Sequence, residues 1–369
     1  MNKVQDLAPS ASMEVSKLAK KLSSEGKEIV NLSLGDTHFK MSDFLKGKIF
    51  EGIELGFTHY DKALGLDVLK NNIADAYKVL PSNVVVSNGV KNVLYSFLLT
   101  QSNKKVGVLE PAWLGYKGIC HLTNTNYIPI SYKKNNFLKN LEATEFDHLI
   151  ICSPNNPDGK VFSVKEIDSM MQIIKRKNAT LILDEIYKDF IYEGNHCFEK
   201  YYGDKNVITL NGFSKSHAVT GLRVGFGIIH SKSTLDLINR IQQNIFTCSN
   251  TVSQYALSFF RENTKVVGEY KSYYEDNRDY VLKELPELYR FKPNGGFYFF
   301  FPPSIFGIIE NAQEFCKNVL NKIGVALIPG EAYGLGSKEY VRMSFCVDKS
   351  ELIKGVKKLK TYFREYEKN

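Results

Sequence analysis

The feature that most restricts the fold of this chain is an alternation of short apolar runs with helical segments over residues 84–229. Runs such as Val106–Leu109, Leu149–Cys152 and Thr180–Leu183 are almost entirely apolar, which is typical of strands buried on both faces of a sheet. Strands that alternate with helices usually pair in parallel, because each helix returns the chain to the edge where it started. The alternation therefore predicts an α/β fold with a mainly parallel sheet flanked by helices.

The pattern changes after this region. Residues 265–285 have the length and periodicity of one long helix, and strand-like runs return at Phe297–Phe301 and Tyr340–Val347. Shorter strands are expected at residues 30–34 and 325–328. These segments predict a smaller α+β unit beside the large sheet.

Length and composition place the chain among ordinary globular proteins. Its 369 residues can form a large domain with a smaller one appended, and 43% hydrophobic with 24% charged residues argues against disorder. The first ten residues lack an apolar signal core, and no apolar run reaches the length of a membrane span. We therefore expect a cytoplasmic protein that does not bind membranes.

Charge and cysteine content exclude several other classes. The net charge of +8 comes from scattered residues, whereas binding to a nucleic-acid backbone needs the positive charge on one face. The six cysteines lie far apart without a C-x-x-C pair, and the seven histidines show no ligand spacing. We expect no nucleic-acid partner, no disulfide framework and no metal site.

The loop Asn211–Gly225, N-G-F-S-K-S-H-A-V-T-G-L-R-V-G, lies between two predicted strands. Lys215 can form an imine with an aldehyde, and the planar guanidinium of Arg223, eight residues later, can hold a phosphate. Together they suggest an anchor for a phosphorylated aldehyde. The alternative is a surface loop with two unrelated cations.

Two other strand ends carry candidate ligand groups. Ser87–Lys91 forms a turn before a helix expected over 92–100, and the free N–H groups of a helix start can bind phosphate. The turn lacks both the Walker pattern and G-x-G-x-x-G, which argues against nucleoside triphosphates and dinucleotides. Trp113, the only tryptophan, follows another strand and can stack on a flat cofactor or pack as a core ring.

Polar residues in apolar surroundings give the remaining candidates. Asp184 stands where a buried strand ends, a costly position unless the carboxylate meets a positive partner such as a protonated ring nitrogen. Prolines on both sides of Asn156 fix the direction of its amide. Arg342 lies inside the last strand and must be paired, and its guanidinium suits a substrate carboxylate.

Taken in order, S-P-N-N-P-x-G, D-E-I-Y, N-G-x-S-K with its arginine, and P-G-x-x-Y-G followed by an arginine resemble one family. The chain is similar to fold-type-I, pyridoxal-phosphate-dependent aminotransferases of the class I/II family, on the aspartate-aminotransferase-like branch. The resemblance runs from Pro9 to the C-terminal strands. It implies an N-terminal arm with part of the small domain at 1–40, a large cofactor-binding domain at 41–265, and a small α+β domain completed by 266–369.

The resemblance also implies roles for matching residues. Lys215 would bind pyridoxal 5'-phosphate and move a proton between the substrate α-carbon and the cofactor. Asp184 would keep the pyridine nitrogen protonated, Asn156 and Tyr187 would hydrogen-bond the ring oxygen, and Trp113 would stack on the ring. The phosphate would be bound by Gly89, the N–H groups of Val90 and Lys91, Ser214, Arg223, and Tyr60 from the other subunit of a homodimer. Gly35, Asn156 and Arg342 would bind the substrate α-carboxylate.

These features predict a transaminase that moves an amino group between an L-amino acid and a 2-oxo acid by a ping-pong mechanism. Lys91 hints at an acidic or polar donor, with 2-oxoglutarate as acceptor, although a solvated lysine at a helix start is an alternative. Residues 35–39 read G-D-T-H-F where many relatives have G-E-P-D-F, which changes the lip of the pocket. The same residues are compatible with a carbon–sulfur β-lyase, a histidinol-phosphate-type aminotransferase or a non-catalytic ligand sensor.

Overall fold

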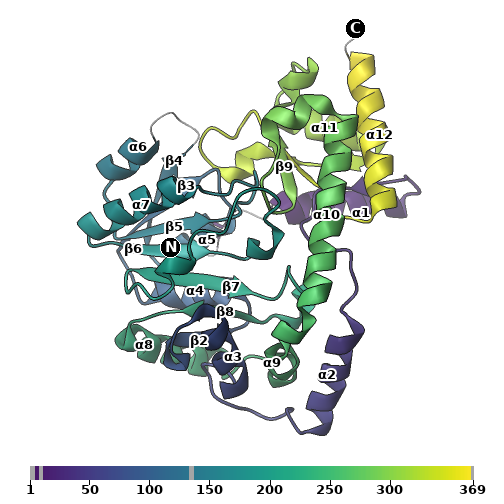
Figure 1. Cartoon of the computed structure of the whole chain (residues 1–369). Helices are drawn as coiled ribbons and strands as arrows, with labels where there is room; N and C mark the ends of the chain where they lie inside the picture. The colour runs from purple at the N-terminus through teal and green to yellow at the C-terminus, as the bar shows by residue number, and fades with distance from the viewer. Residues whose placement is uncertain (1–4, 8–10, 133–136, 367–369) are drawn as a thin grey trace.

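The computed structural model describes residues 5–7, 11–132 and 137–366 (Figure 1). Its large sheet contains, in spatial order, β2 (Val84–Ser87), β8 (Gly225–Ile228), β7 (Val207–Gly212), β6 (Thr180–Asp184), β5 (His148–Cys152), β3 (Lys105–Glu110) and β4 (Asn126–Ser131). The strands from β7 to β4 are parallel, whereas β8 is antiparallel to both of its neighbours. The predicted α/β fold with a mainly parallel sheet is confirmed.

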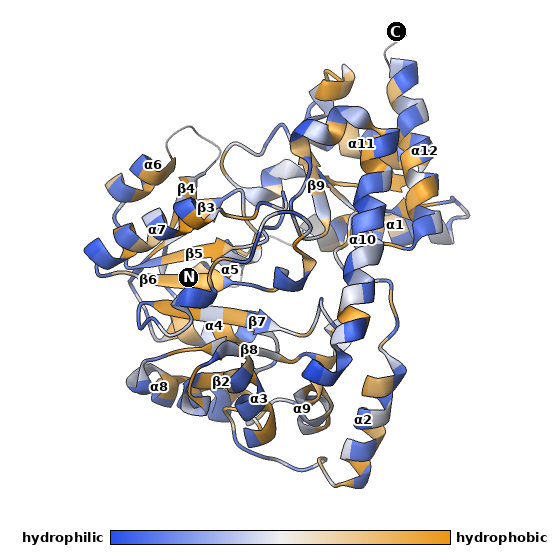
Figure 2. Cartoon of the chain, in the orientation of Figure 1, coloured by the Kyte–Doolittle hydropathy of each residue, from blue (hydrophilic) through white to orange (hydrophobic). Residues whose placement is uncertain are grey.

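Helices cover both faces of this sheet. They are α3 (Asp67–Tyr77), α4 (Val90–Leu99), α5 (Gly115–Leu122), α6 (Phe137–Ala143), α7 (Val164–Arg176), α8 (Lys232–Ile245) and α9 (Thr251–Ser258). Alternate residues of a strand face opposite sides. In β5, Ile150 packs with Leu94 of α4, and its neighbour Leu149 packs in the core that contains Ile174 of α7. Apolar side chains therefore fill both layers beside the sheet, as the orange strands in Figure 2 indicate.

A second, antiparallel sheet contains β11 (Ile328–Pro329), β12 (Val341–Ser344) and β9 (Tyr298–Phe301). It packs with α11 (Ala312–Ile323) and α12 (Lys349–Tyr366) around buried aromatic rings such as Phe315 and Phe345. Nearby, β1 (Val30–Asn31) pairs in parallel with β10 (Val325–Ala326). Residues from the two ends of the chain therefore lie side by side.

The remaining helices connect these parts. Helix α10 (Thr264–Glu284) corresponds to the long helix predicted at 265–285 and runs from the lower to the upper part of the molecule in Figure 1. Helix α2 (Asp43–Glu54) packs against α9, and α1 (Ala11–Ser24) contacts β10 and β11. Within the described ranges, no helix combines the length and the apolar character that a bilayer span requires.

Three predicted segments differ from the structure. Helix α4 begins at Val90 rather than at residue 92, because Gly89, with φ of +87°, turns the chain directly into it. The strand expected at 325–328 is split into β10 and β11, since the two halves pair with different partners. The strand expected at 30–34 is reduced to β1, which ends where its pairing with β10 ends.

Candidate active site

A cavity of about 330 Å³ lies where the carboxyl ends of β5, β6 and β7 face the second sheet. This is the edge of a parallel sheet where loops after several strands meet and where ligands of α/β proteins bind. The lining comes from both sheets: Asp184 and Lys215 follow strands of the large sheet, and Tyr298 and Arg342 belong to the second one.

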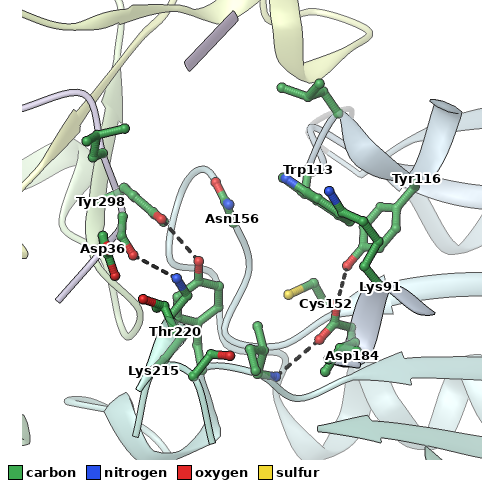
Figure 3. Close-up of a pocket in the computed structure, with 18 of the residues that line it drawn as sticks. Asp36, Lys91, Trp113, Tyr116, Cys152, Asn156, Asp184, Lys215, Thr220 and Tyr298 are labelled. Carbon is green, nitrogen blue, oxygen red and sulfur yellow. Dashed lines mark hydrogen bonds between the residues drawn. The ribbon is translucent and has the colours of Figure 1, made fainter. Parts of the chain in front are cut away.

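Lys215 lies in the loop after β7 with its amine directed into the cavity (Figure 3). Its Nζ donates a hydrogen bond of 2.9 Å to the carbonyl oxygen of Gly35. Burial lowers the pKa of the Lys215 amine, and the nearby charges of Arg223 and Arg342 act in the same direction. A lower pKa increases the neutral fraction of the amine, and only the neutral amine attacks a carbonyl carbon or accepts a proton.

Asp184 is the last residue of β6 and only 5% exposed. Its carboxylate accepts hydrogen bonds from the Tyr116 hydroxyl at 2.7 Å (Figure 3) and from the backbone N–H of Ile186 at 3.2 Å. Burial nevertheless raises the pKa of Asp184 to about 6. A positive group in the cavity next to this carboxylate would stabilise its ionised form.

An anion-binding cradle lies at the start of α4. A Cβ at Gly89 would come within 2.8 Å of Arg223 Nη2, and a Cβ at Gly225 would overlap the backbone nitrogen of Val90. Gly89 therefore leaves room for the Arg223 guanidinium at the helix start, and Gly225 lets β8 pass close to the backbone of Val90. Ser214 also lines the cavity. Positive charge and converging N–H groups are the chemistry that binds a phosphate.

Arg342 forms the opposite wall and is 4% exposed. Its two terminal nitrogens donate to neutral oxygens, Asn156 Oδ1 at 3.1 Å and the carbonyl of Ser33 at 2.6 Å, and its Nε has no partner among the described residues. The guanidinium lies 4.1 Å from the ring centre of Tyr298 and 5.2 Å from that of Tyr333. A buried cation held by neutral groups favours a carboxylate ligand.

Aromatic side chains complete the cavity. The Tyr187 hydroxyl lies 3.1 Å from the Tyr298 hydroxyl, and burial raises the pKa of Tyr187 well above its usual range. The ring of Trp113 meets that of Tyr116 edge-on at 5.2 Å. Lys91 Nζ lies 5.0 Å from the Trp113 ring, and burial, with a further contribution from Arg223, lowers the pKa of Lys91.

The cavity brings together almost all residues that the sequence nominated. They are Gly35, Gly89, Val90, Lys91, Trp113, Asn156, Asp184, Tyr187, Ser214, Lys215, Arg223 and Arg342. Tyr60 is different, because it is 85% exposed and lines a separate surface hollow with residues 248–252. Its expected contact is with the phosphate of another subunit, which a single chain does not test, so that role stays a prediction.

Several lining residues were missed from the sequence. Tyr116 lies three residues after Trp113, at the start of α5, and its closeness in sequence to a nominated residue is the only signal that could have suggested it. Cys152 ends a run that was predicted to be a buried strand; it is buried, and it also lines the cavity. Tyr298 lies in the run F-Y-F-F-F, where no sequence signal separates a site residue from a core residue, whereas Tyr333 is the tyrosine of the P-G-x-x-Y-G motif, to which no site role was assigned.

Comparison with known proteins agrees with this geometry. A family model described as aminotransferase class I and II matches residues 27–359. Aspartate aminotransferase of Thermotoga maritima is 28% identical over 98% of both chains, and (5-formylfuran-3-yl)methyl phosphate transaminase of Methanocaldococcus jannaschii is 28% identical over 96% of both. Among solved structures, the aspartate aminotransferase of Thermotoga maritima superimposes with a TM-score of 0.88 at 26% identity, covering 99% of this chain and all of the other.

Proposed function

The chain belongs to the class I and II aminotransferase family, whose members depend on pyridoxal 5'-phosphate, and on this premise we propose a specific transaminase reaction. The enzyme transfers an amino group between an L-amino acid with an acidic or polar side chain and a 2-oxo acid, with 2-oxoglutarate as acceptor, in a ping-pong cycle. The observation that carries the proposal is one cavity that contains a lysine of lowered pKa, a buried acid, an anion cradle and a buried arginine.

The residues of the cavity fit this cofactor. The space beside Gly89, which a Cβ would fill, faces Arg223 and would receive the phosphate, and Ser214 of the same cavity would also bind it. Asp184 would hold negative charge beside the pyridine nitrogen, and a protonated nitrogen there would offset the effect of burial, which raises the pKa of this carboxyl to about 6. When bound, the cofactor supplies an aldehyde that links to amines and a ring that withdraws electrons from the substrate α-carbon.

The protein groups divide the remaining work. Arg342, with Asn156, binds the α-carboxylate and thereby orients the substrate over the cofactor. Lys215 Nζ would take the proton from the substrate α-carbon and pass it to the cofactor, because a lowered pKa increases the fraction of the amine that is neutral and can accept a proton. The carbonyl of Gly35 holds Nζ on the substrate side of the cavity.

The choice of an acidic donor rests on two observations. Lys91 is exposed and places its ammonium group beside the Trp113 ring at the same cavity, where it can meet a second carboxylate. Several relatives, including those of Thermotoga maritima and Bacillus subtilis, are named aspartate aminotransferase. The comparisons do not favour the β-lyase or histidinol-phosphate alternatives.

We also propose the organisation expected from the sequence. Residues 1–40 and 266–369 form a small domain, and residues 41–265 form the large one. A homodimer would place Tyr60 at the phosphate of the neighbouring subunit. The exposure of Tyr60, together with apolar side chains on α2 such as Phe50 at 69%, supports this arrangement because large exposed apolar groups mark interaction surfaces.

The experiment is a donor and acceptor screen with the purified holoenzyme. We expect aspartate or glutamate to react fastest with 2-oxoglutarate or oxaloacetate, and half-reactions without acceptor to stop after one turnover per site. Cystathionine is assayed in parallel without a 2-oxo acid. Sustained release of pyruvate and ammonia from it would overturn the transaminase proposal in favour of the β-lyase.

A further inference from the structure

Tyr298 stands at the junction of three groups of the proposed active site. It belongs to β9, and its hydroxyl lies 3.1 Å from that of Tyr187, which follows β6 of the large sheet (Figure 3). The Arg342 guanidinium lies 4.1 Å above its ring. In the second sheet, Arg342 pairs with Phe300, which lies two residues after Tyr298 in β9. Residues two apart in a strand lie on the same side of a sheet, so the side chains of Tyr298 and Arg342 are on one face.

Gly35 shows that the hydroxyl position of Tyr298 is built into the fold. A Cβ at residue 35 would overlap the Tyr298 hydroxyl oxygen, so only glycine leaves room for it. The carbonyl oxygen of the same Gly35 accepts the hydrogen bond from Lys215 Nζ. The Tyr298 hydroxyl therefore occupies the space between the residue that holds the lysine and the tyrosine expected at the cofactor ring.

The donor in the hydrogen bond between Tyr187 and Tyr298 follows from the number of hydroxyl protons, because each tyrosine has only one. Tyr187 has one hydroxyl proton, and in the proposed function it donates that proton to the ring oxygen of the cofactor. The contact of 3.1 Å can then persist only if Tyr298 donates to Tyr187. The charge of Arg342 favours this direction, because it lowers the pKa of Tyr298 against the raising effect of burial.

Resting on that proposed function, we propose that Tyr298 is a positioning residue for the reaction. Its hydroxyl donates to Tyr187, and this strengthens the hydrogen bond from Tyr187 to the ring oxygen of the cofactor. As a result, Lys215 Nζ, when it is bonded to the cofactor, loses its proton at lower pH. The physical reason is that consecutive hydrogen bonds polarise one another. A ring oxygen whose negative charge is drawn toward Tyr187 holds the proton on the neighbouring Nζ less strongly.

The test is a pH titration of the cofactor absorbance of the holoenzyme, which does not depend on turnover. Tyr298→Phe keeps the ring and its contact with Arg342, and removes only the hydroxyl. We expect the midpoint to move to higher pH by roughly 0.5 unit, the size expected from a change of some tens of per cent in one charge-assisted hydrogen bond. The matched control is Tyr362→Phe on α12, which removes a buried hydroxyl that lies outside the cavity lining and has no partner among the described residues, and it should leave the midpoint unchanged.

A double-variant cycle tests the route through Tyr187. In a Tyr187→Phe background, Tyr298→Phe should add no further shift. An unchanged midpoint in the single variant, or an equal shift in both backgrounds, would overturn the proposal, even if the melting temperature falls. Gly35→Ala gives a second probe, because the new Cβ must displace the Tyr298 hydroxyl, and it should shift the midpoint in the same direction.

Failure of this inference can be separated from failure of the proposed function. If the wild-type protein transfers no amino group in the donor and acceptor screen, the proposed function fails, and the role of Tyr298 fails with it. If the wild-type band titrates and Tyr298→Phe titrates at the same pH, only the role of Tyr298 is wrong.

Discussion

The two sheets build the pocket in different ways. The large sheet contributes through residues at strand ends and in the loops that follow: Asp184 ends β6, Lys215 follows β7, and the anion cradle at Gly89 follows β2. The second sheet contributes from within its strands, with Arg342 in β12 and Tyr298 in β9. Glycine-containing loops can bring several backbone N–H groups to one point, whereas neighbouring strands hold side chains at fixed spacing.

The difference assigns separate tasks to the two regions. The loops of the large sheet hold the groups that suit the cofactor, a buried acid and a phosphate cradle. In the proposed function, the strands of the second sheet provide a buried cation, Arg342, for the substrate carboxylate and a hydroxyl, that of Tyr298, which contacts Tyr187. Substitutions in the loops of the large sheet should therefore mainly change cofactor binding and chemistry, whereas substitution of Arg342 should mainly change substrate binding.

Lys215 faces both regions, so its removal should have the largest effect. We expect Lys215→Ala to lower turnover by at least about 10²–10⁴-fold, the usual contribution of general acid–base transfer. The measurement is the initial transamination rate, with borohydride reduction and peptide mapping to show the cofactor fixed at Lys215 in the wild type. The matched control Lys205→Ala changes an exposed lysine and should retain the wild-type rate. Cofactor trapped at another lysine would contradict the assignment.

Asp184 tests the cofactor side alone. Asp184→Asn keeps the shape but removes the charge beside the expected pyridine nitrogen, and we expect turnover to fall by about 10²–10³-fold, as for the loss of one preorganised electrostatic group. The substrate concentration at half-maximal rate should change little. A large change in that concentration with unchanged turnover would break the proposed division between the two regions.

Asp184→Asn should also change how the stability of the cofactor-free protein depends on pH. Burial raises the pKa of Asp184 from 3.8 to about 6, so the folded state holds this proton more tightly than the unfolded chain. The stabilising contribution is complete below the unfolded value and is lost as the pH rises through about 6. A shift of about two units corresponds to roughly 3 kcal/mol. Asp184→Asn should therefore be more stable than wild type at pH 8, by up to that amount, and the advantage should shrink at pH 5, as measured by urea unfolding.

Substitution of Arg342 and of Arg223 compares the two sides of the pocket directly. Arg342→Ala should lower kcat/KM by about 10–10²-fold through weaker substrate binding, and Arg223→Ala should weaken cofactor binding by a similar factor, since a hydrogen bond to a charged group contributes about 1.5–3 kcal/mol. Both constants are measured for both variants, with cofactor saturating in the substrate assays. If the two variants alter the same constant, the two sides of the pocket do not have separate tasks.

Tyr60 should give the smallest effect. Tyr60→Phe removes one hydroxyl, so cofactor affinity should fall by no more than about tenfold, the value of one hydrogen bond. Mixing Tyr60→Phe and Lys215→Ala subunits should restore wild-type cofactor affinity in one site of each mixed dimer. Titration of the mixed protein with cofactor measures this, and a mixed dimer without such a site would exclude a shared pocket.

The large-sheet half of the site could be predicted because each residue leaves a local mark. Asp184 is a charge at the end of an apolar run, and Lys215 lies in a loop of small residues between two such runs. Such residues can be recognised from the order of strands and turns along the chain alone. The parallel sheet that brings them together follows from the same alternation.

The second half could be predicted only in part. Arg342 was found because a charge inside a strand stands out, but Tyr298 is one aromatic residue in the run F-Y-F-F-F. Its role depends on the register of β9 against β12 and on the approach of Gly35 from the other end of the chain. Register and long-range approach are set by tertiary packing, which local patterns do not encode.

The pairing of β1 with β10 has a consequence for synthesis on the ribosome. The strands of the large sheet are all translated by residue 228, and domains can begin to fold during translation. In contrast, β1 can pair only after residues 325 and 326 have been translated, and the carbonyl of Ser33 can accept its hydrogen bond only after Arg342 has been translated. A nascent chain can therefore assemble the phosphate cradle early but cannot complete the substrate side until almost the whole polypeptide has emerged. We expect a chain that ends before Arg342 to bind pyridoxal phosphate but to transfer no amino group.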